Sequence, residues 1–204
     1  MFDVLIIGGG VAGVSCALVL GSAHKKPFVH DKKIGILTHQ RGGNLQDAVL
    51  NNVYGVPYGK LGSEIMLESL QHLEQAYPHI EQIPNEKVMS VIAFSNYYQI
   101  HTSDNIYEAK IVVVAVGASN TFNIDGLMDY VIAHQKTIPE KNRIQLVNQD
   151  HKVAENLYVA GVLAGHRSQV AIASGSGAAV ATDILTLWNN GTQSHSHDSI
   201  KKDK

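Results

Sequence analysis

The sequence predicts an α/β fold in which helices pack on a parallel sheet. Near the start of the chain, a strand-like run at 2–7 enters a glycine-rich turn and a helix, and 157–185 repeats this order near the end. Between them lies a β-rich stretch whose last part, 111–116, is apolar throughout. Because a strand of this kind is usually covered on both faces, it favours a parallel sheet. We therefore expect a parallel sheet with helices and a small β-meander layer.

Composition is that of an ordinary globular domain. The chain has 204 residues, 45% of them hydrophobic and 17% charged, and a net charge of −2. Without a basic stripe, nucleic-acid binding is not expected. The single cysteine excludes an internal disulfide framework, a CxxC redox pair and a cysteine-based zinc site, which fits a reducing, cytoplasmic compartment. We also expect no membrane segment, since no run approaches the roughly 20 apolar residues of a bilayer span, and no secretory signal.

The order of the elements can be read from the apolar pattern and its punctuation. After the first strand, turn and helix we expect a short strand at 27–33 that ends in an acid, a loop at 35–62, an amphipathic helix capped by Ser63, two meander strands within 86–104, an apolar strand before Gly117, and the final strand and helix. The stretch 124–156 gives no clear pattern. Residues 189–204 are polar and low in bulk, so we expect a disordered tail after a single domain over 1–188.

The glycine turn has the spacing G-x-G-x-x-G at Gly8, Gly10 and Gly13. In a dinucleotide-binding turn the first glycine allows the tight bend, the second lets the backbone approach a pyrophosphate, and the third lets helix and strand pack closely. The start of the following helix offers free N–H groups and a partial positive charge to that pyrophosphate. Strand, turn and helix together predict a dinucleotide site.

Asp31 is expected at the end of the second strand, about 20 residues after the turn. An acid in this place accepts hydrogen bonds from the adenosine ribose hydroxyls and disfavours a 2′-phosphate, so NADP is not expected in this slot. The turn and the acid leave NAD and FAD open, because both dinucleotides carry an ADP half.

Four segments occur in an informative order: DVLIIGGGVAGVSCALVL, VYGVPYGKLGSEIMLESLQHL, EAKIVVVAVGAS and ENLYVAGVLAGHRSQVAIASGSGAAVATDIL. Together they resemble the FAD domain of the thioredoxin reductase-like pyridine nucleotide–disulfide oxidoreductases. The similarity covers roughly residues 2–118 and 144–188. It implies a Rossmann-like FAD/NAD(P)-binding three-layer fold, FAD as the cofactor and an oxidoreductase activity.

The resemblance also implies which residues hold the FAD. The pyrophosphate would lie against Gly8, Gly10, Val11, Ala12 and Gly13. The adenosine would meet Asp31, Lys32 and the backbone of Val88. Thr38, His39 and Gln40 would lie beside the isoalloxazine ring. Ala115, Gly117, Gly161 and Val162 would line the strand ends, while Ser168, Gln169 and Val170 would present the start of the last helix to the flavin pyrimidine.

The chain departs from the family pattern in three places. The family inserts a second dinucleotide-binding domain before its last strand, whereas here only residues 118–156 separate Gly117 from the final strand, with no second glycine motif. The redox CxxC is missing, and Cys16 falls on the first helix, where a small packed residue is expected. Val162 stands where the family carries a flavin-contacting aspartate.

Three functions remain open at this stage. The first is a stand-alone FAD oxidoreductase whose electrons come from an external nicotinamide donor or redox protein. The second is a non-catalytic flavin-binding or redox-sensing module, and the third an NAD-binding protein. His39 and His166 are the polar candidates for proton transfer near a flavin, against solvent-facing loop positions. No metal site is expected. An open flavin face is often covered by a homodimer, although the sequence itself shows no interface.

Overall fold

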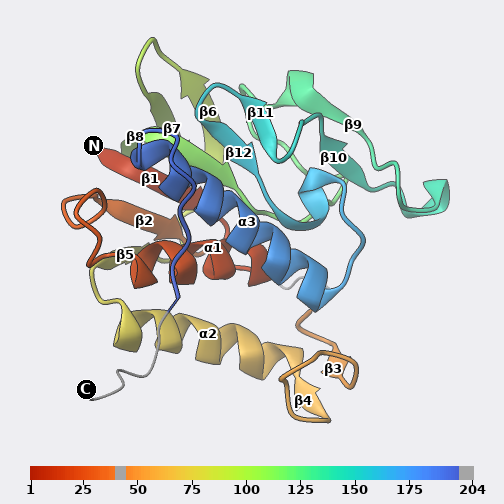
Figure 1. Ribbon diagram of the computed structural model, residues 1–204. Helices are drawn as coiled ribbons and strands as arrows, with labels where there is room; N and C mark the ends of the chain where they lie inside the picture. Colours follow the sequence, from red (N-terminus) through yellow and green to blue (C-terminus); the bar gives the residue numbers. More distant parts are fainter. Residues whose placement is uncertain (40–44, 198–204) are drawn as a thin grey trace, which may run out of the picture.

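The computed structural model describes residues 1–39 and 45–197, and it is built on one eight-stranded mixed sheet (Figure 1). Its central strands lie side by side in the order β12 (Leu157–Val159), β8 (Ile106–Val114), β1 (Phe2–Ile7), β2 (Ile34–Leu37) and β5 (Ile80–Ile83). All four of these neighbouring pairs are parallel. The predicted α/β fold with a parallel sheet is confirmed.

Three helices cover one face of this sheet, as Figure 1 shows. They are α1 (Val11–Ser22), α2 (Gly62–Ala76) and α3 (Val170–Trp188). Val4 and Ile6 of β1 belong to the core cluster under these helices, whereas Leu5 and Ile7 belong to the cluster on the opposite face. Since successive side chains of a strand point to opposite faces, this alternation explains why β1 is apolar at every position from Val4 to Ile7.

The opposite face is covered by the meander. It is made of β6 (Val88–Ala93) and β7 (Tyr98–Thr102), which continue antiparallel into the first half of β8. The second half of β8 pairs with β1 and β12 instead, so this one strand belongs to both layers. Val91 and Ile100 bury the meander on the apolar face of the sheet, which confirms the three-layer arrangement.

The remaining elements are short. They comprise the β3–β4 hairpin (Val49–Leu50 and Lys60–Leu61), the β9–β10 pair (Val131–Ala133 and Ile144–Leu146), β11 (Lys152–Ala154) and three single helical turns, η1 (Met128–Tyr130), η2 (Pro139–Lys141) and η3 (Gly161–Ala164). The stretch that gave no clear sequence pattern, 124–156, thus contains only three-residue elements, which are too short to show a period.

The second strand lies elsewhere than the sequence indicates. Residues 27–33 form successive turns, in which the N–H of His30 donates to the carbonyl of Lys26 and that of Lys32 to Val29. Val29 is fully buried from this turn, so its apolar character serves the helix-side core and not a strand. The strand beside β1 is β2, in register from Val4 opposite Ile34 to Ile7 opposite Leu37.

Two further points concern the ends of elements. The helix α2 begins at Gly62 with Leu61 as its N-cap, so Ser63 lies in the first turn and is not the cap. Residue 62 is glycine because a Cβ there would meet the carbonyl oxygen of Leu45 at 1.9 Å. After α3 the chain turns back, and the N–H of Ser194 donates to Thr186 Oγ1 at 3.1 Å while its hydroxyl accepts from Asn189. The segment expected as a disordered tail therefore keeps a defined course over 189–194.

Among the described residues, α3 is long and apolar enough to cross a membrane by length and composition alone. Its residues Val180, Ala181, Ile184 and Leu185 are buried in the core shared with α1 and the sheet. This is how the core helix of a folded domain packs.

Candidate functional site

The three glycines of the turn after β1 have different reasons to be glycine. At Gly8, φ is +119° and a Cβ would lie 2.6 Å from the carbonyl oxygen of Ala115. At Gly13 a Cβ would lie 1.9 Å from the carbonyl oxygen of Gly8. At Gly10 φ is −81°, and nothing lies within 4 Å of an added Cβ. The fold therefore requires Gly8 and Gly13, while Gly10 keeps a stretch of backbone bare toward open space.

The bare backbone leads directly into the start of α1. Gly10 is the N-cap, no side chain caps the helix, and its first turn contains no acidic residue. The first N–H groups of a helix have no partner within it and carry the positive end of its dipole. This end of α1 is thus suited to an anion that approaches over Gly10.

The turn follows β1, from which the strand order of the sheet proceeds toward β2 on one side and toward β8 on the other. The N–H of Gly8 donates to Leu37 of β2 at 2.9 Å, and on the other side the N–H of Ala115 donates to Ile7 at 2.8 Å. One strand further, Ala160 donates to Val114 at 2.9 Å. The carboxyl ends of four parallel strands therefore meet around the turn, which is where open α/β sheets bind their ligands.

The last helix approaches the same place closely. A Cβ on Gly177 of α3 would lie 1.9 Å from the carbonyl oxygen of Ala12, and one on Gly161 would lie 3.0 Å from the Ala12 side chain. Gly161 also has a φ of +76°. The small residues of α3 hence allow it to cross the first turn of α1. Like α1, α3 starts without a side-chain cap or an acidic residue in its first turn.

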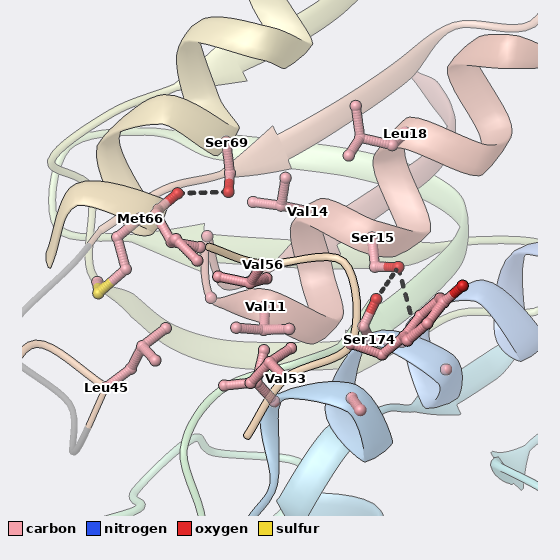
Figure 2. A pocket seen from close by; sticks show the side chains of 17 residues that line it. Val11, Val14, Ser15, Leu18, Leu45, Val53, Val56, Met66, Ser69 and Ser174 are labelled. Atoms are coloured by element: carbon pink, nitrogen blue, oxygen red, sulfur yellow. Dashed lines mark hydrogen bonds between the residues drawn. The ribbon is translucent and has the colours of Figure 1, made fainter. Parts of the chain in front are cut away.

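A pocket of about 520 Å³ opens beside the glycine turn (Figure 2). Its floor is one side of α1, its walls are α2 and the start of α3, and the loop around Val53 covers it. Gly10, Val11 and Val170, three predicted site residues, line it together. Among the described residues that line it, none is charged, and the hydroxyl of Ser15 donates to the Ser174 carbonyl at 2.9 Å. An uncharged ring system suits such a pocket.

Side chains, and not glycines alone, hold the turn between β12 and α3. The buried Ser176 hydroxyl accepts the N–H of Gly161 at 2.8 Å and lies 3.0 Å from His151 Nε2. His151 Nε2 lies 3.0 Å from His166 Nε2. His151 itself has a φ of +69°, an uncommon conformation for a residue with a side chain.

A third imidazole closes this turn from the side of β9. His134 is buried, and its Nδ1 accepts the N–H of Lys136 at 3.1 Å. That acceptor fixes the tautomer, so Nε2 carries the hydrogen and donates to the carbonyls of Val162 and His166, each at 3.2 Å. One ring therefore ties both ends of the η3 segment together.

Burial shifts the protonation of this cluster. It lowers the pKa of His151, with Asp150 acting weakly in the opposite direction. It also lowers the pKa of His166, helped by the positive charges of His151, Lys136 and His134. The His151 and His166 rings, whose Nε2 atoms face each other, are consequently both neutral at neutral pH.

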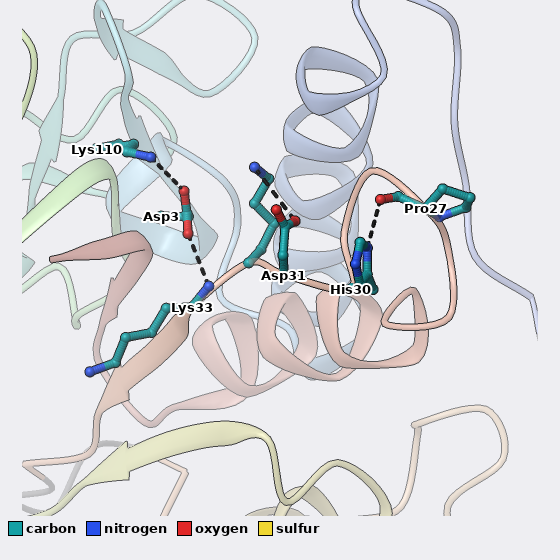
Figure 3. A network of polar contacts seen from close by, with 7 residues as sticks. Asp3, Pro27, His30, Asp31, Lys33 and Lys110 are labelled. Atoms are coloured by element: carbon teal, nitrogen blue, oxygen red, sulfur yellow. Dashed lines mark hydrogen bonds and ion pairs between the residues drawn. The ribbon is translucent and has the colours of Figure 1, made fainter.

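Asp31 does not lie at this site, which corrects the expectation for the ribose acid. It precedes β2, so it lies at the amino edge of the sheet, beyond the far end of α1 (Figure 3). The 12 residues of α1 span about 18 Å. Asp31 is exposed and lies 3.9 Å from the amino group of Lys32. Nearby, Asp3 accepts from the N–H of Lys33 and pairs with Lys110.

The other predicted residues fall into three groups. Gly8, Gly10, Val11, Ala12, Gly13, Thr38, Ala115, Gly161 and Val170 lie at the carboxyl edge around the turn, and Gly117, Val162, Ser168 and Gln169 follow strand ends there. Lys32 is at the opposite edge with Asp31, and Val88 starts the meander. Gln40 lies outside the described residues.

The two candidate histidines are not brought together. His39 follows β2 and His166 follows η3, after β12, and β1 and β8 lie between these strands. With strands about 4.8 Å apart, the two positions are separated by roughly 14 Å across the sheet edge. They can serve opposite ends of an extended ligand but not one proton transfer.

A family model decides the wider relationship: residues 2–176 match the model of the pyridine nucleotide-disulphide oxidoreductases. The chain belongs to this family. The match spans the glycine turn, the meander and the turn before α3, so the site just described lies within the family's shared region.

Among curated proteins, the oxidoreductase CzcO of Bacillus subtilis is 26% identical over 199 residues, which is 90% of this chain. That stretch is 52% of CzcO, so the chain spans about half the length of the curated relative it matches. CzcO is itself described only as an uncharacterized oxidoreductase.

Solved structures of thioredoxin reductases share the fold. The enzyme of Gloeobacter violaceus superposes with a TM-score of 0.71 at 15% identity, over 98% of this chain and 99% of that one. That of Lactococcus lactis gives 0.68 at 12% identity, over 93% and 100%. A ferredoxin-flavin thioredoxin reductase of Clostridium acetobutylicum gives 0.67 at 18% identity, over 93% and 98%.

The sequence contains no pair of cysteines that could form a redox dithiol. Cys16 is the single cysteine of the sequence, it is fully buried in the helix-side core, and burial raises the pKa of its thiol. Within the described residues no group of three or more acidic, histidine or cysteine side chains gathers to hold a metal.

Sequence reasoning missed the residues that hold the η3 turn, His134, His151 and Ser176. The partners that they hold in this turn lie 15 or more residues away in the chain. No local motif marks them. The one available signal was that His134 and Ser176 are polar side chains within otherwise apolar or glycine-rich stretches.

Proposed function

We propose that this chain binds FAD across the glycine turn and acts as an oxidoreductase whose electrons come from an external donor. The observation that carries the proposal is Gly10. The fold gives no steric reason for glycine there, whereas Gly8 and Gly13 could not be anything else. A glycine kept bare at a helix start is what a pyrophosphate needs.

The residues around the turn fit the cofactor. The N–H groups of the first turn of α1 would hold the pyrophosphate, and the uncapped start of α3 would face the flavin end, where a positive dipole stabilises the negative charge of a reduced ring. The flavin supplies hydride and electron transfer when it is bound. The chain's own residues would position it and exclude water on the side of Val11 and Val170.

The turn before α3 would contribute orientation. Gly161 is fixed by Ser176, and the carbonyls of Val162 and His166 are fixed by His134. With both carbonyls engaged, η3 cannot rotate freely, so the segment that replaces the family's aspartate keeps one geometry. This support favours binding in spite of Val162.

We propose an external electron donor because the chain departs from the family pattern in two respects. It lacks a second glycine motif and a pair of cysteines, so neither a built-in nicotinamide site nor a dithiol is available. One fold relative is named a ferredoxin-flavin thioredoxin reductase, which shows that this fold also occurs where a ferredoxin takes part. The proposed electron donor is a nicotinamide nucleotide or a redox protein. The proposal also includes a cytoplasmic location and a homodimer that covers the open face of the flavin.

The proposal is tested by reconstitution. Purified chain, freed of ligand and mixed with FAD, should retain one flavin per chain after gel filtration. Anaerobic addition of NADH, NADPH or a reduced ferredoxin should then bleach the visible flavin absorbance with at least one of them. A chain that retains no FAD would refute the proposal.

A non-catalytic flavin sensor is the second candidate, and the burial of Cys16 favours it, since the chain can pass no electrons through a thiol. In that case the chain retains FAD, yet none of the three donors bleaches it faster than they bleach free FAD. NAD binding without FAD binding would instead support the third candidate.

A further inference from the structure

Dinucleotide-binding folds usually carry an acid where the adenosine ribose lies. The corresponding position of this site has no carboxylate. The carboxyl end of β2 is fixed by its register, with Leu37 opposite Ile7 and its carbonyl bound to the N–H of Gly8. The residues that follow are Thr38 and His39. Asp31 lies three residues before Ile34, the first residue of β2, and therefore at the amino edge of the sheet.

Thr38 is already engaged. Its N–H donates to Ile83 of β5 at 2.8 Å, its side chain is turned toward the same carbonyl, and it is buried. It packs at the junction of β2 and β5 and offers little to a ligand. His39 is the next residue, half-buried, and the described hydrogen bonds leave its ring out of the protein's own network.

The acid that follows the neighbouring strand, β5, is also already hydrogen-bonded within the protein. Glu86, three residues after β5, is buried and accepts hydrogen bonds from Thr102, Asn105 and Tyr107. Although burial acts to raise the pKa of this carboxyl, those three bonds hold it below its usual value. Glu86 therefore stabilises the meander turn and is not available to a ribose.

We propose that His39 takes the place of the carboxylate at the adenosine ribose, and that the site accepts a 2′-phosphorylated adenosine about as well as an unphosphorylated one. The inference rests on the proposed dinucleotide site. An imidazole can donate to or accept from ribose hydroxyls and carries no negative charge that repels a phosphate. The usual acid excludes a 2′-phosphate through like-charge repulsion, which amounts to on the order of 100-fold or more in affinity.

A histidine in this position changes which adenosine ligands the slot can hold. With a carboxylate there, a 2′-phosphate would be excluded. Without one, the slot, when free of FAD, admits adenosine ligands with or without the 2′-phosphate.

The test uses a matched pair of ligands, ADP-ribose and 2′-phospho-ADP-ribose, titrated into the full ligand-free chain by calorimetry. We expect their dissociation constants to lie within about tenfold of each other. The variant His39→Asp should weaken 2′-phospho-ADP-ribose by on the order of 100-fold while changing ADP-ribose much less. The control Asp31→Asn should change neither, and thermal melts should show that both variants fold.

Each outcome bears on a separate claim. If ADP-ribose binds while 2′-phospho-ADP-ribose binds 100-fold or more weakly, or if Asp31→Asn alters the ratio, the inference about His39 is refuted and the dinucleotide site stands. If the ratio is near one but His39→Asp leaves it unchanged, His39 is not the residue that faces the ribose. If neither ADP-ribose nor FAD binds, the proposed function fails and the inference fails with it.

Discussion

The two strand–turn–helix units of the chain reach the same edge of the sheet by different means. Between β1 and α1 the turn is made by Gly8 and Gly13, which carry no side chain at all. Between β12 and α3 it is held by side chains, with Ser176 on Gly161 and His134 on two carbonyls. The first turn presents bare backbone, while the second is held by side chains behind it, so in the proposed function the first would bind the ligand and the second would orient it.

The largest effect is expected where the bare turn meets its own backbone. Gly13→Ala would place a Cβ 1.9 Å from the Gly8 carbonyl oxygen, so the turn must open. We expect a loss of about 3 kcal/mol in the free energy of unfolding, measured by urea denaturation. A loss below 1 kcal/mol would show that the turn is not packed as described.

The side-chain turn should respond next. Ser176→Ala leaves the buried N–H of Gly161 without an acceptor and should cost about 2 kcal/mol. Ser174→Ala, on the same helix, is the matched control, because the Ser174 backbone carbonyl that binds Ser15 is kept; it should cost less than about 0.5 kcal/mol. Equal losses for the two variants would remove the special role of Ser176.

Acid should loosen the side-chain turn and spare the glycine turn. The pKa values of His151 and His166 are lowered by burial, so the unfolded chain binds more protons than the folded one, and stability falls as pH drops below about 6.5. His79, whose pKa burial and His24 also lower, adds to the fall from the far edge of the sheet. Melting curves at pH 7.5 and 5.5 measure it.

Two variants separate these contributions. His166→Gln should reduce the difference between the two melting temperatures, and His79→Gln should reduce it independently, since the two sites share no contact. If His166→Gln leaves the pH dependence unchanged, the imidazole pair does not titrate as described.

The smallest effect is expected at the glycine of α3 that does not touch α1. Nothing lies within 4 Å of a Cβ on Gly175, and this residue lines the pocket. Gly175→Ala should stabilise the chain by up to about 1 kcal/mol through helix propensity, whereas Gly177→Ala should destabilise it, because its Cβ meets Ala12. A loss of stability from Gly175→Ala would contradict this difference within one helix.

These regions also explain what the sequence could predict. The glycine turn depends on a local spacing, so its residues and their roles follow from the pattern, as does the three-layer fold. The second strand does not: both 27–29 and Ile34–Leu37 are short apolar runs, and only pairing with β1 selects the latter. Asp31 was therefore assigned to the wrong edge of the sheet.

The η3 turn was out of reach for a related reason. His151 meets Ser176 and His166 because a left-handed turn, β12 and α3 converge in space, and no spacing along the chain encodes that convergence. Patterns report what neighbours in sequence do, whereas polar networks between elements depend on the finished packing.

The central claim, that Gly10 is glycine for a ligand and not for the fold, is tested most directly by FAD binding to Gly10→Val. We predict that the variant costs no more than about 1 kcal/mol of stability, the loss from valine as a poorer N-cap, since the φ of −81° is allowed to any residue and the space is open. It should bind FAD at least about 100-fold more weakly than the unaltered chain, measured by flavin retention and calorimetry. Equal FAD affinity in the two proteins would contradict the account.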